Sequence, residues 1–276
     1  MRVFVHRYRL VPRRAHGLLT RPREGALLRV QRRVDVGFAD LHPWPELGDA
    51  TLDEQLALLA RGAPTLQARA SLRFAALDAD ARRRGVSLFD GLTIPESHWP
   101  GNEPPAEFDT IKIKGLQPVP PRVRVRIDFN ASLTAEEFLR LELPREQIDF
   151  VEDPCPYDEV GWRRLREKTG LRLALDRFEG DADVLIHKPA LGAEFPKHRD
   201  VVVTSYMDHP VGQFFAAYVA ATHDVNPRCG LFTHVLYEPD AFLERVESDG
   251  ARLRAPRGNG IGFDDLLESL EWTSIG

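Results

Sequence analysis

The first forty residues alternate apolar and polar positions, a pattern typical of strands that have one face in water. This alternation predicts an antiparallel sheet with strands over 3–10, 25–33 and 34–40. Thr51 and Glu54 then form a capping box ahead of an apolar pattern of helical period, and a second helical stretch covers 65–84. We therefore expect an α+β lobe over residues 1–85.

Short apolar runs replace this pattern after the Pro- and Gly-rich segment 94–105. Runs of this kind are typical of parallel α/β arrays, and a closed barrel needs about eight of them. The predicted strands are 110–114, 123–130, 148–153, 171–178, 184–188, 201–206 and 230–236, with 86–94 as a weaker first member. The pattern predicts a modified (β/α)8 TIM-type barrel over 86–249, and it leaves open whether 250–276 returns to the first lobe.

Two connections in this barrel are too short for a helix. Only about seven residues separate 114 from 122, and a similar number separate 176 from 184, whereas a parallel crossover usually needs about a dozen residues. We therefore expect two crossover helices to be replaced by loops.

Composition narrows the class of protein. The chain has 276 residues, 43% of them hydrophobic, and a formal net charge of −5. No apolar run approaches the roughly 20 residues of a membrane span, and the charge gives no reason to expect a nucleic-acid partner. The N-terminal residues do not resemble a secretory signal, so we expect a cytoplasmic protein. Cys155 and Cys229 are expected to be buried free thiols.

Three acidic residues end successive predicted strands. Asp128, Glu152 and Asp176 each close an apolar run, and they follow one another at intervals of 24 residues. A single aspartate at a strand end is more often a helix cap. Three with matched spacing would meet at the active face of a barrel, where their repulsion favours a hard cation such as Mg²⁺ between them.

Lysines flank these acids on both sides in the sequence. Lys112 and Lys114 lie two residues apart on one predicted strand, so both side chains point into the barrel mouth, and Lys188 follows a later strand. Taken alone, the first two would read as a solvated edge strand. As a set beside the acids, neighbouring ammonium groups lower one another's pKa, and a lysine neutral near pH 7 can act as a general base.

These motifs, in this order, resemble the enolase superfamily, in the branch that contains the o-succinylbenzoate synthases and muconate-lactonizing enzymes. The resemblance runs from about 110 to 212, and Lys112-Ile-Lys114, Asp128-Phe-Asn130, Glu152-Asp-Pro-Cys155, Asp176 and Lys188 carry it. Within that branch the chain is most similar to o-succinylbenzoate synthases, because 126–132 and 150–155 resemble their metal-ligand strands. The chain departs from the family pattern at 177–178 and at Tyr206, His209 and Pro210.

The resemblance implies roles for the site residues. It implies Mg²⁺, with Mn²⁺ as a possible substitute, bound by Asp128, Glu152 and Asp176. It implies Lys114 as the base and Lys188 as a cation that stabilises the enediolate. Substrate contacts are expected from Lys112, Asn130, Thr204 and Ser205, and from loops 15–21 and 41–48 of the first lobe, which would be the superfamily's capping domain.

The implied reaction is the syn dehydration of 2-succinyl-6-hydroxy-2,4-cyclohexadiene-1-carboxylate to 2-succinylbenzoate in menaquinone biosynthesis. The expected partner is thus a small-molecule carboxylate, with no nucleic acid and no membrane, and the oligomeric state is open. Two alternatives stay open as well: an N-acylamino acid racemase or dipeptide epimerase, and a barrel without catalysis that binds a ligand.

Overall fold

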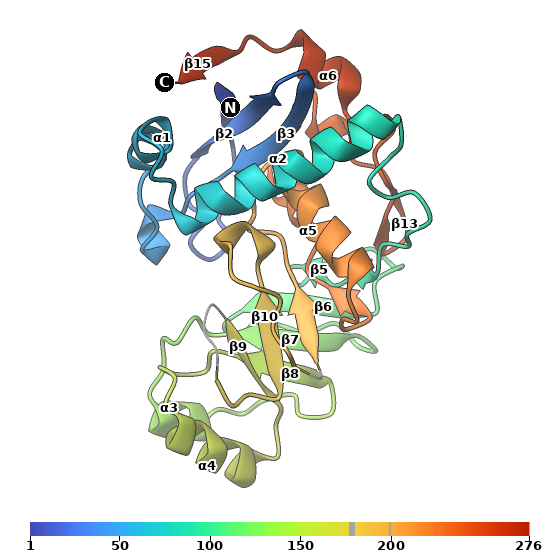
Figure 1. The fold of residues 1–276 in the computed structure, drawn as a ribbon. Helices are drawn as coiled ribbons and strands as arrows, with labels where there is room; N and C mark the ends of the chain where they lie inside the picture. Colours follow the sequence, from blue (N-terminus) through green and yellow to red (C-terminus); the bar gives the residue numbers. More distant parts are fainter. Residues whose placement is uncertain (177–179, 199, 276) are drawn as a thin grey trace.

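A four-stranded antiparallel sheet forms the first lobe of the computed structural model, which describes residues 1–176, 180–198 and 200–275 (Figure 1). Its strands are β1 (Arg2–Leu10), β2 (Arg23–Arg32), β3 (Asp35–Leu41) and β15 (Thr273–Ile275). They lie in the order β15-β1-β2-β3, and Val3 of β1 lies opposite Ile275 of β15. The C-terminal residues are therefore part of this sheet, which we call the cap sheet.

Two helices cover the cap sheet. The first, α1 (Leu52–Ala60), follows the short 3-10 helix η1 (Pro45–Leu47) and begins at the capping box of Thr51 and Glu54. The longer α2 (Leu66–Arg84) lies against β3, and a Cβ atom on Gly37 would come within 1.9 Å of the carbonyl oxygen of Ala75. Only a glycine at this position allows so close an approach of helix and strand.

The second lobe is built on a curled sheet of seven parallel strands in the order β11-β10-β9-β8-β7-β6-β5. These strands are β5 (Trp99–Pro100), β6 (Thr110–Lys114), β7 (Arg124–Asp128), β8 (Ile148–Glu152), β9 (Leu173–Asp176), β10 (Val184–His187) and β11 (Val201–Val203). The six from β6 to β11 coincide with predicted strands. The predicted end of the strand over 171–178 lies outside the described residues.

The edges of this sheet are joined by backbone hydrogen bonds. The short strand β12 (Arg228–Cys229) pairs in parallel with β4 (Glu96–Ser97), which directly precedes β5. Gly230 forms a parallel bridge with Thr204, which follows β11. The strand ends therefore surround a common centre, as the barrel prediction requires.

Two of the predicted barrel strands are wrong. Residues 86–94 form no strand in the barrel, and Leu88 instead donates its backbone N–H to Gly260 at 2.7 Å. Residues 230–236 contain the 3-10 helix η3 (Thr233–Leu236), and the strand at this place in the barrel is β12, slightly earlier in the sequence. Leu88, Phe89, Leu231 and Phe232 of these two segments are buried in the apolar cluster that also contains residues of the cap sheet.

Helices follow only some of the barrel strands. They are α3 (Ala135–Leu139) after β7, α4 (Glu159–Thr169) after β8 and α5 (Pro210–Thr222) after β11. No helix follows β6, and seven residues connect β9 to β10, so the two predicted loop crossovers are confirmed within the described residues. Between β10 and β11 the described chain contains only the 3-10 helix η2 (Pro189–Leu191).

The remaining elements return the chain to the cap sheet. They are η4 (Leu243–Arg245), β13 (Ser248–Asp249), β14 (Arg252–Leu253) and α6 (Asp264–Ser269). No described helix combines the length and the apolar character that crossing a membrane requires.

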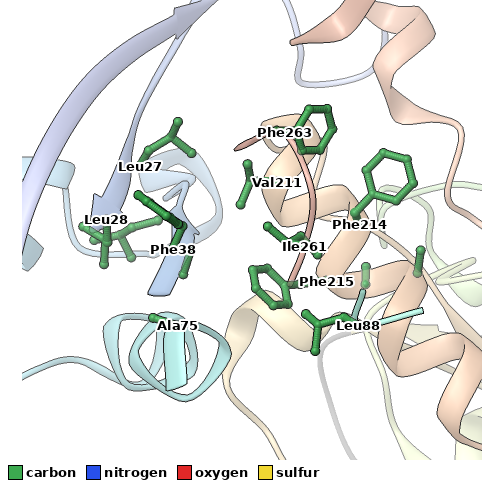
Figure 2. Packing of buried hydrophobic residues seen from close by; sticks show 14 of the residues in the cluster. Leu27, Leu28, Phe38, Ala75, Leu88, Val211, Phe214, Phe215, Ile261 and Phe263 are labelled. Carbon is green, nitrogen blue, oxygen red and sulfur yellow. The ribbon is translucent and has the colours of Figure 1, made fainter. Parts of the chain in front are cut away.

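One continuous apolar core joins the two lobes. Phe214 and Phe215 of α5 belong to the same buried cluster as Leu27 and Phe38 of the cap sheet. Figure 2 shows these side chains facing one another, with Ile261 from the C-terminal segment between the two layers. Burying such aromatic and aliphatic side chains contributes roughly 1.5–3 kcal/mol each, so the cap sheet is held firmly over the barrel.

Candidate active site

The predicted acids and lysines lie side by side at the carboxyl ends of the barrel strands. In the strand register, Lys114 of β6 lies opposite Asp128 of β7, and Asp128 lies opposite Glu152 of β8. Asp176 ends the next strand, β9, and Lys188 directly follows β10. Because neighbouring parallel strands lie about 4.8 Å apart, this register brings the side chains together around one centre.

Lys112 forms ion pairs with two of the three acids. Its ammonium nitrogen Nζ lies 2.6 Å from both carboxylate oxygens of Glu152 and 2.9 Å from Oδ2 of Asp128. Both acids are almost fully buried, with exposed fractions of 1% for Glu152 and 2% for Asp128. The ammonium group therefore balances part of a negative charge that has no access to bulk water.

The two predicted catalytic lysines contact different acids. Lys114 donates to Oδ2 of Asp128 at 2.5 Å and to Oδ1 of Asn130 at 3.1 Å. Lys188 donates to Oδ2 of Asp176. Asn130 has a positive φ of 49°, and its backbone N–H donates to Asp128 at 2.9 Å, so this residue turns the chain and orients the acid.

The electrostatics of the cluster reflect three crowded carboxylates. Burial, followed by the charge of Asp128, raises the pKa of Glu152 to about 8. Burial also opposes ionisation of Asp128, but Lys112 and Lys114 outweigh it and hold that pKa well below its usual range. Burial would lower the pKa of Lys112, yet Asp128 and Glu152 raise it above its ordinary value. The depression expected between neighbouring lysines is thus outweighed at Lys112.

Asp153 adds a fourth carboxylate next to the cluster. Its Oδ1 accepts a hydrogen bond from the backbone N–H of Asp176 at 3.2 Å, and burial together with the charge of Asp176 raises its pKa to about 7. Asp153 therefore contacts the backbone of a predicted site residue.

The donor set suits a hard divalent cation. Carboxylate oxygens are the ligands that Mg²⁺ prefers, and Oδ1 of Asp176 is buried without a hydrogen-bond partner among the described residues. As the side chains stand, no three His, Cys, Asp or Glu residues in the described ranges are arranged to hold one ion, because Lys112 lies between two of the acids. Binding an ion there requires that ammonium group to move.

A cavity of about 100 Å³ opens beside the cluster and contains the predicted substrate contacts. Lys112, Lys114, Asn130, Asp176, Lys188, Thr204 and Ser205 all line it. Ser205 shares a hydrogen bond of 2.6 Å with Thr233, whereas Oγ1 of Thr204 is buried without a partner among the described residues. The cavity thus brings together every lysine of the set with both hydroxyl residues.

The capping lobe closes this cavity from above. His16 and Leu18 from loop 15–21 and Leu47 from loop 41–48 line it, at the two loops where substrate contacts were expected. A Cβ on Gly17 would lie 3.3 Å from Cγ of Lys114, so this loop lies directly on that lysine. Burial, with Lys114 next in importance, lowers the pKa of His16 to about 4.

Two histidines that the sequence did not single out line the cavity: His98, and His16 within the predicted substrate loop 15–21. Neither belongs to a motif, and His98 lies in the Pro- and Gly-rich segment 94–105. Of the departures from the family pattern, 177–178 lie outside the described residues. His209 caps α5, and Trp44 donates to the carbonyl oxygen of Tyr206 at 2.9 Å, while Tyr206 itself also lines the cavity.

Comparisons with known proteins agree with this arrangement. Residues 3–81 match the family model described as the N-terminal domain of O-succinylbenzoate synthase. The chain is also 35% identical to an o-succinylbenzoate synthase from Bdellovibrio bacteriovorus, over an alignment of 306 residues that covers 92% of each protein. The chain belongs to the o-succinylbenzoate synthase family, within the enolase superfamily.

Solved structures support the fold of this o-succinylbenzoate synthase family member. A muconate lactonizing enzyme from Mycobacterium smegmatis superposes with a TM-score of 0.77 at 18% identity, covering 97% of this chain and 98% of that one. The L-Ala-D/L-Glu epimerase from Bacillus subtilis superposes with a TM-score of 0.76 at 15% identity, covering 95% and 98%. The chain is therefore an enzyme-family member with a curled parallel sheet and a separate antiparallel cap.

Proposed function

We propose that this protein is an o-succinylbenzoate synthase, a lyase that dehydrates 2-succinyl-6-hydroxy-2,4-cyclohexadiene-1-carboxylate to 2-succinylbenzoate. One observation carries the proposal. Three carboxylates and three lysines meet at adjoining strand ends beside a cavity, in a chain that is 35% identical to a protein of that name over most of its length. In a cell that makes menaquinone, the reaction would serve that pathway, and we expect it in the cytoplasm.

The chemistry requires removal of a proton next to a carboxylate. We assign this step to Lys114, whose Nζ contacts Asp128 and Asn130 at the cavity wall. The neutral amine takes the α-proton, and the resulting ammonium group returns a proton to the β-hydroxyl on the same face, which leaves as water. Proton transfer by a positioned side chain contributes roughly 10²–10⁴-fold to the rate.

The remaining lysines stabilise charge. Lys188 approaches the cavity from β10, on the far side of Asp176, and its ammonium group would stabilise the enediolate electrostatically. Lys112 would hold a carboxylate oxygen of the substrate once it leaves Asp128 and Glu152. Both lysines are mostly buried, with exposed side-chain fractions of 14% and 15%, and charge stabilisation is strongest where water is excluded.

Mg²⁺ is the cofactor that fits this donor set. We propose that Asp128, Glu152 and Asp176 hold it, with Mn²⁺ as a possible substitute. When bound, it supplies positive charge to the substrate carboxylate as the α-proton leaves. Glu152, whose pKa burial and the charge of Asp128 raise, would ionise more readily beside such a cation.

Racemisation is the second candidate reaction. Lys114 and Lys188 come from strands β6 and β10, which three strands separate, so they approach the cavity from different sides. Two such amines could exchange protons with both faces of an N-acylamino acid. Structural similarity to the Bacillus subtilis epimerase is the reason to consider racemisation as the second candidate reaction.

A turnover assay separates these activities. The metal-free protein should show no conversion of the cyclohexadiene precursor, and added Mg²⁺ should produce the absorbance of 2-succinylbenzoate. Replacing Asp176 by Asn should raise the Mg²⁺ concentration needed for half activity at least about tenfold, because a charged ligand becomes neutral. Racemisation of N-succinylamino acids without dehydration would overturn the proposal in favour of the second candidate, and neither activity would indicate a binding protein.

A further inference from the structure

His98 reaches the floor of the active-site cavity from a segment without any catalytic motif. It lies between β4 and β5, is 5% exposed, and donates its backbone N–H to Cys229 at 2.9 Å. A Cβ on Gly230 would lie 2.9 Å from Cε1 of His98 and 2.6 Å from Cγ2 of Thr204. The imidazole ring and Thr204 therefore meet over a glycine that leaves room for them.

Arg126 fixes the proton of this ring. Its Nη1 lies 2.9 Å from Nδ1 of His98, and a guanidinium group can only donate hydrogen bonds. Nδ1 must therefore accept, which leaves the proton of the neutral ring on Nε2. Burial, followed by the charge of Arg126, lowers the pKa of His98 well below its usual range, so the ring is neutral at neutral pH.

Arg126 itself is held rigidly inside the barrel. Its Nε donates to Asp149 at 2.8 Å, and its terminal nitrogens donate to the carbonyl oxygen of Arg228 at 2.7 Å and to Oδ1 of Asn226 at 3.0 Å. The guanidinium group also lies 4.7 Å from the centre of the Phe150 ring. The tautomer of His98 is thus set by a guanidinium group that its other contacts hold in place.

Within the ranges that the structure describes, the Nε2–H group of His98 has no hydrogen-bond acceptor. Oγ1 of the adjacent Thr204 likewise has no hydrogen-bond partner there. Two uncharged donors therefore face one part of the cavity. On the way around the sheet, β6, β7 and β8 lie between β5, which follows His98, and β9, which ends in Asp176, whereas β10 alone lies between β9 and β11, which precedes Thr204. A ligand oxygen placed between these two donors would satisfy both groups.

We propose that His98 is a substrate-binding residue whose Nε2–H, together with Thr204, donates hydrogen bonds to an oxygen of the substrate's acyl arm. The inference rests on the proposed function for the identity of that substrate. A fixed neutral donor binds an oxygen without adding charge to a site that already holds three lysines. It also disfavours analogues without the oxygen, because its own hydrogen bond then stays unmade.

Two substitutions separate this role from a structural one. In H98N, Oδ1 can replace Nδ1 as the acceptor for Arg126, but no donor reaches the cavity. In H98Q, the longer amide can place a donor where Nε2 was. Titration calorimetry with Mg²⁺ present should show that H98N weakens binding of 2-succinylbenzoate about 10–100-fold, as expected for a lost hydrogen bond to a charged group. Binding of H98Q should stay within about threefold of the unaltered protein.

Benzoate, which lacks the succinyl arm, is the matched probe. H98N should bind it as the unaltered protein does. If H98N binds both ligands more weakly to the same degree, or binds both as the unaltered protein does, the inference is wrong. It is also wrong if H98N binds 2-succinylbenzoate normally and H98Q binds it weakly, because His98 would then only support Arg126. If the unaltered protein neither binds nor forms 2-succinylbenzoate, the proposed function fails first.

The tautomer can be checked without any ligand. Nitrogen-15 NMR of the labelled protein should show His98 protonated at Nε2 alone from pH 6 to pH 8. A proton on Nδ1, or an imidazolium signal in this range, would contradict the arrangement from which the inference starts.

Discussion

Strand β7 buries two opposite charges on the same face, Arg126 and, two residues on, Asp128. Arg126 has a partner for each donor-bearing nitrogen, and these partners come from loops and strands around the barrel floor. Asp128 instead lies among two other acids and two lysines. The first group is arranged to stay in one state, whereas the second is crowded with charges whose balance a ligand can change.

The difference between these two groups separates charges that stabilise the fold from charges that are available for chemistry. A fully satisfied buried charge fixes its neighbours, as Arg126 fixes His98. Crowded like charges raise the energy of the folded state until a cation joins them, and such strain is typical of sites that bind ions or move protons. The barrel floor and the barrel mouth should therefore respond oppositely to substitution.

The largest effect is expected at the mouth. K114A should lower the turnover number about 10²–10⁴-fold, because the lost amine transfers protons, and it should cost less stability than a substitution at the floor, because Lys112 still pairs with Asp128. Steady-state kinetics with the cyclohexadiene precursor measures this. K168A, at an exposed lysine of α4, is the control. Activity close to that of the unaltered protein would show that another group is the base.

The floor should show the reverse. R126M should lower the free energy of unfolding by about 2–4 kcal/mol, since it leaves buried acceptors without a donor. The control is R124M: that arginine's side chain is 63% exposed and reaches the same Asp149 at 3.3 Å, so its loss should cost less than about 1 kcal/mol. Denaturant titration compares the two variants. Equal losses would mean that the buried network adds nothing beyond a surface ion pair.

A smaller and pH-dependent effect is expected beside the cluster. The pKa of Asp153 is raised to about 7 from an ordinary value of 3.8, so the folded protein keeps a proton that the unfolded chain has released. The contribution of Asp153 to the stability of the metal-free protein should therefore fall as pH rises from about 4 to 7 and then level off. D153N lacks this loss and should be more stable by about 1–2 kcal/mol at pH 8, with little difference at pH 4.

The substitution suits the backbone, because Asp153 has a φ of 42° and asparagine tolerates that region. Denaturant midpoints at pH 4 and pH 8 provide the comparison, with D224N, at an exposed aspartate, as the control. A stability difference of the same size at both pH values would indicate a packing effect instead.

The sequence predicted the barrel mouth well because its signals are local and repeated. Apolar runs of strand length end in Asp128, Glu152 and Asp176 at equal spacing, and a register of parallel strands turns that spacing into proximity. The Lys-x-Lys pair is likewise a local pattern on a single strand. Their roles as ligands and base remain predictions.

The barrel floor could not be predicted in the same way. The role of His98 depends on Arg126, Asn226 and Arg228, which only the closed ring of strands brings together. Residues 86–94 have the composition of a strand, but their backbone pairs with Gly260 near the C-terminus. Contacts between such distant segments leave no periodic trace in the sequence.

The pairing of β1 with β15 has a consequence for synthesis. The first strand of the chain obtains this neighbour only when residues 273–275 have been made, so Val3, Phe4 and Val5 lack their partners on this edge during most of synthesis. An unpaired edge of this kind can pair with another chain, so the cap sheet is open to misassembly until residues 273–275 join it.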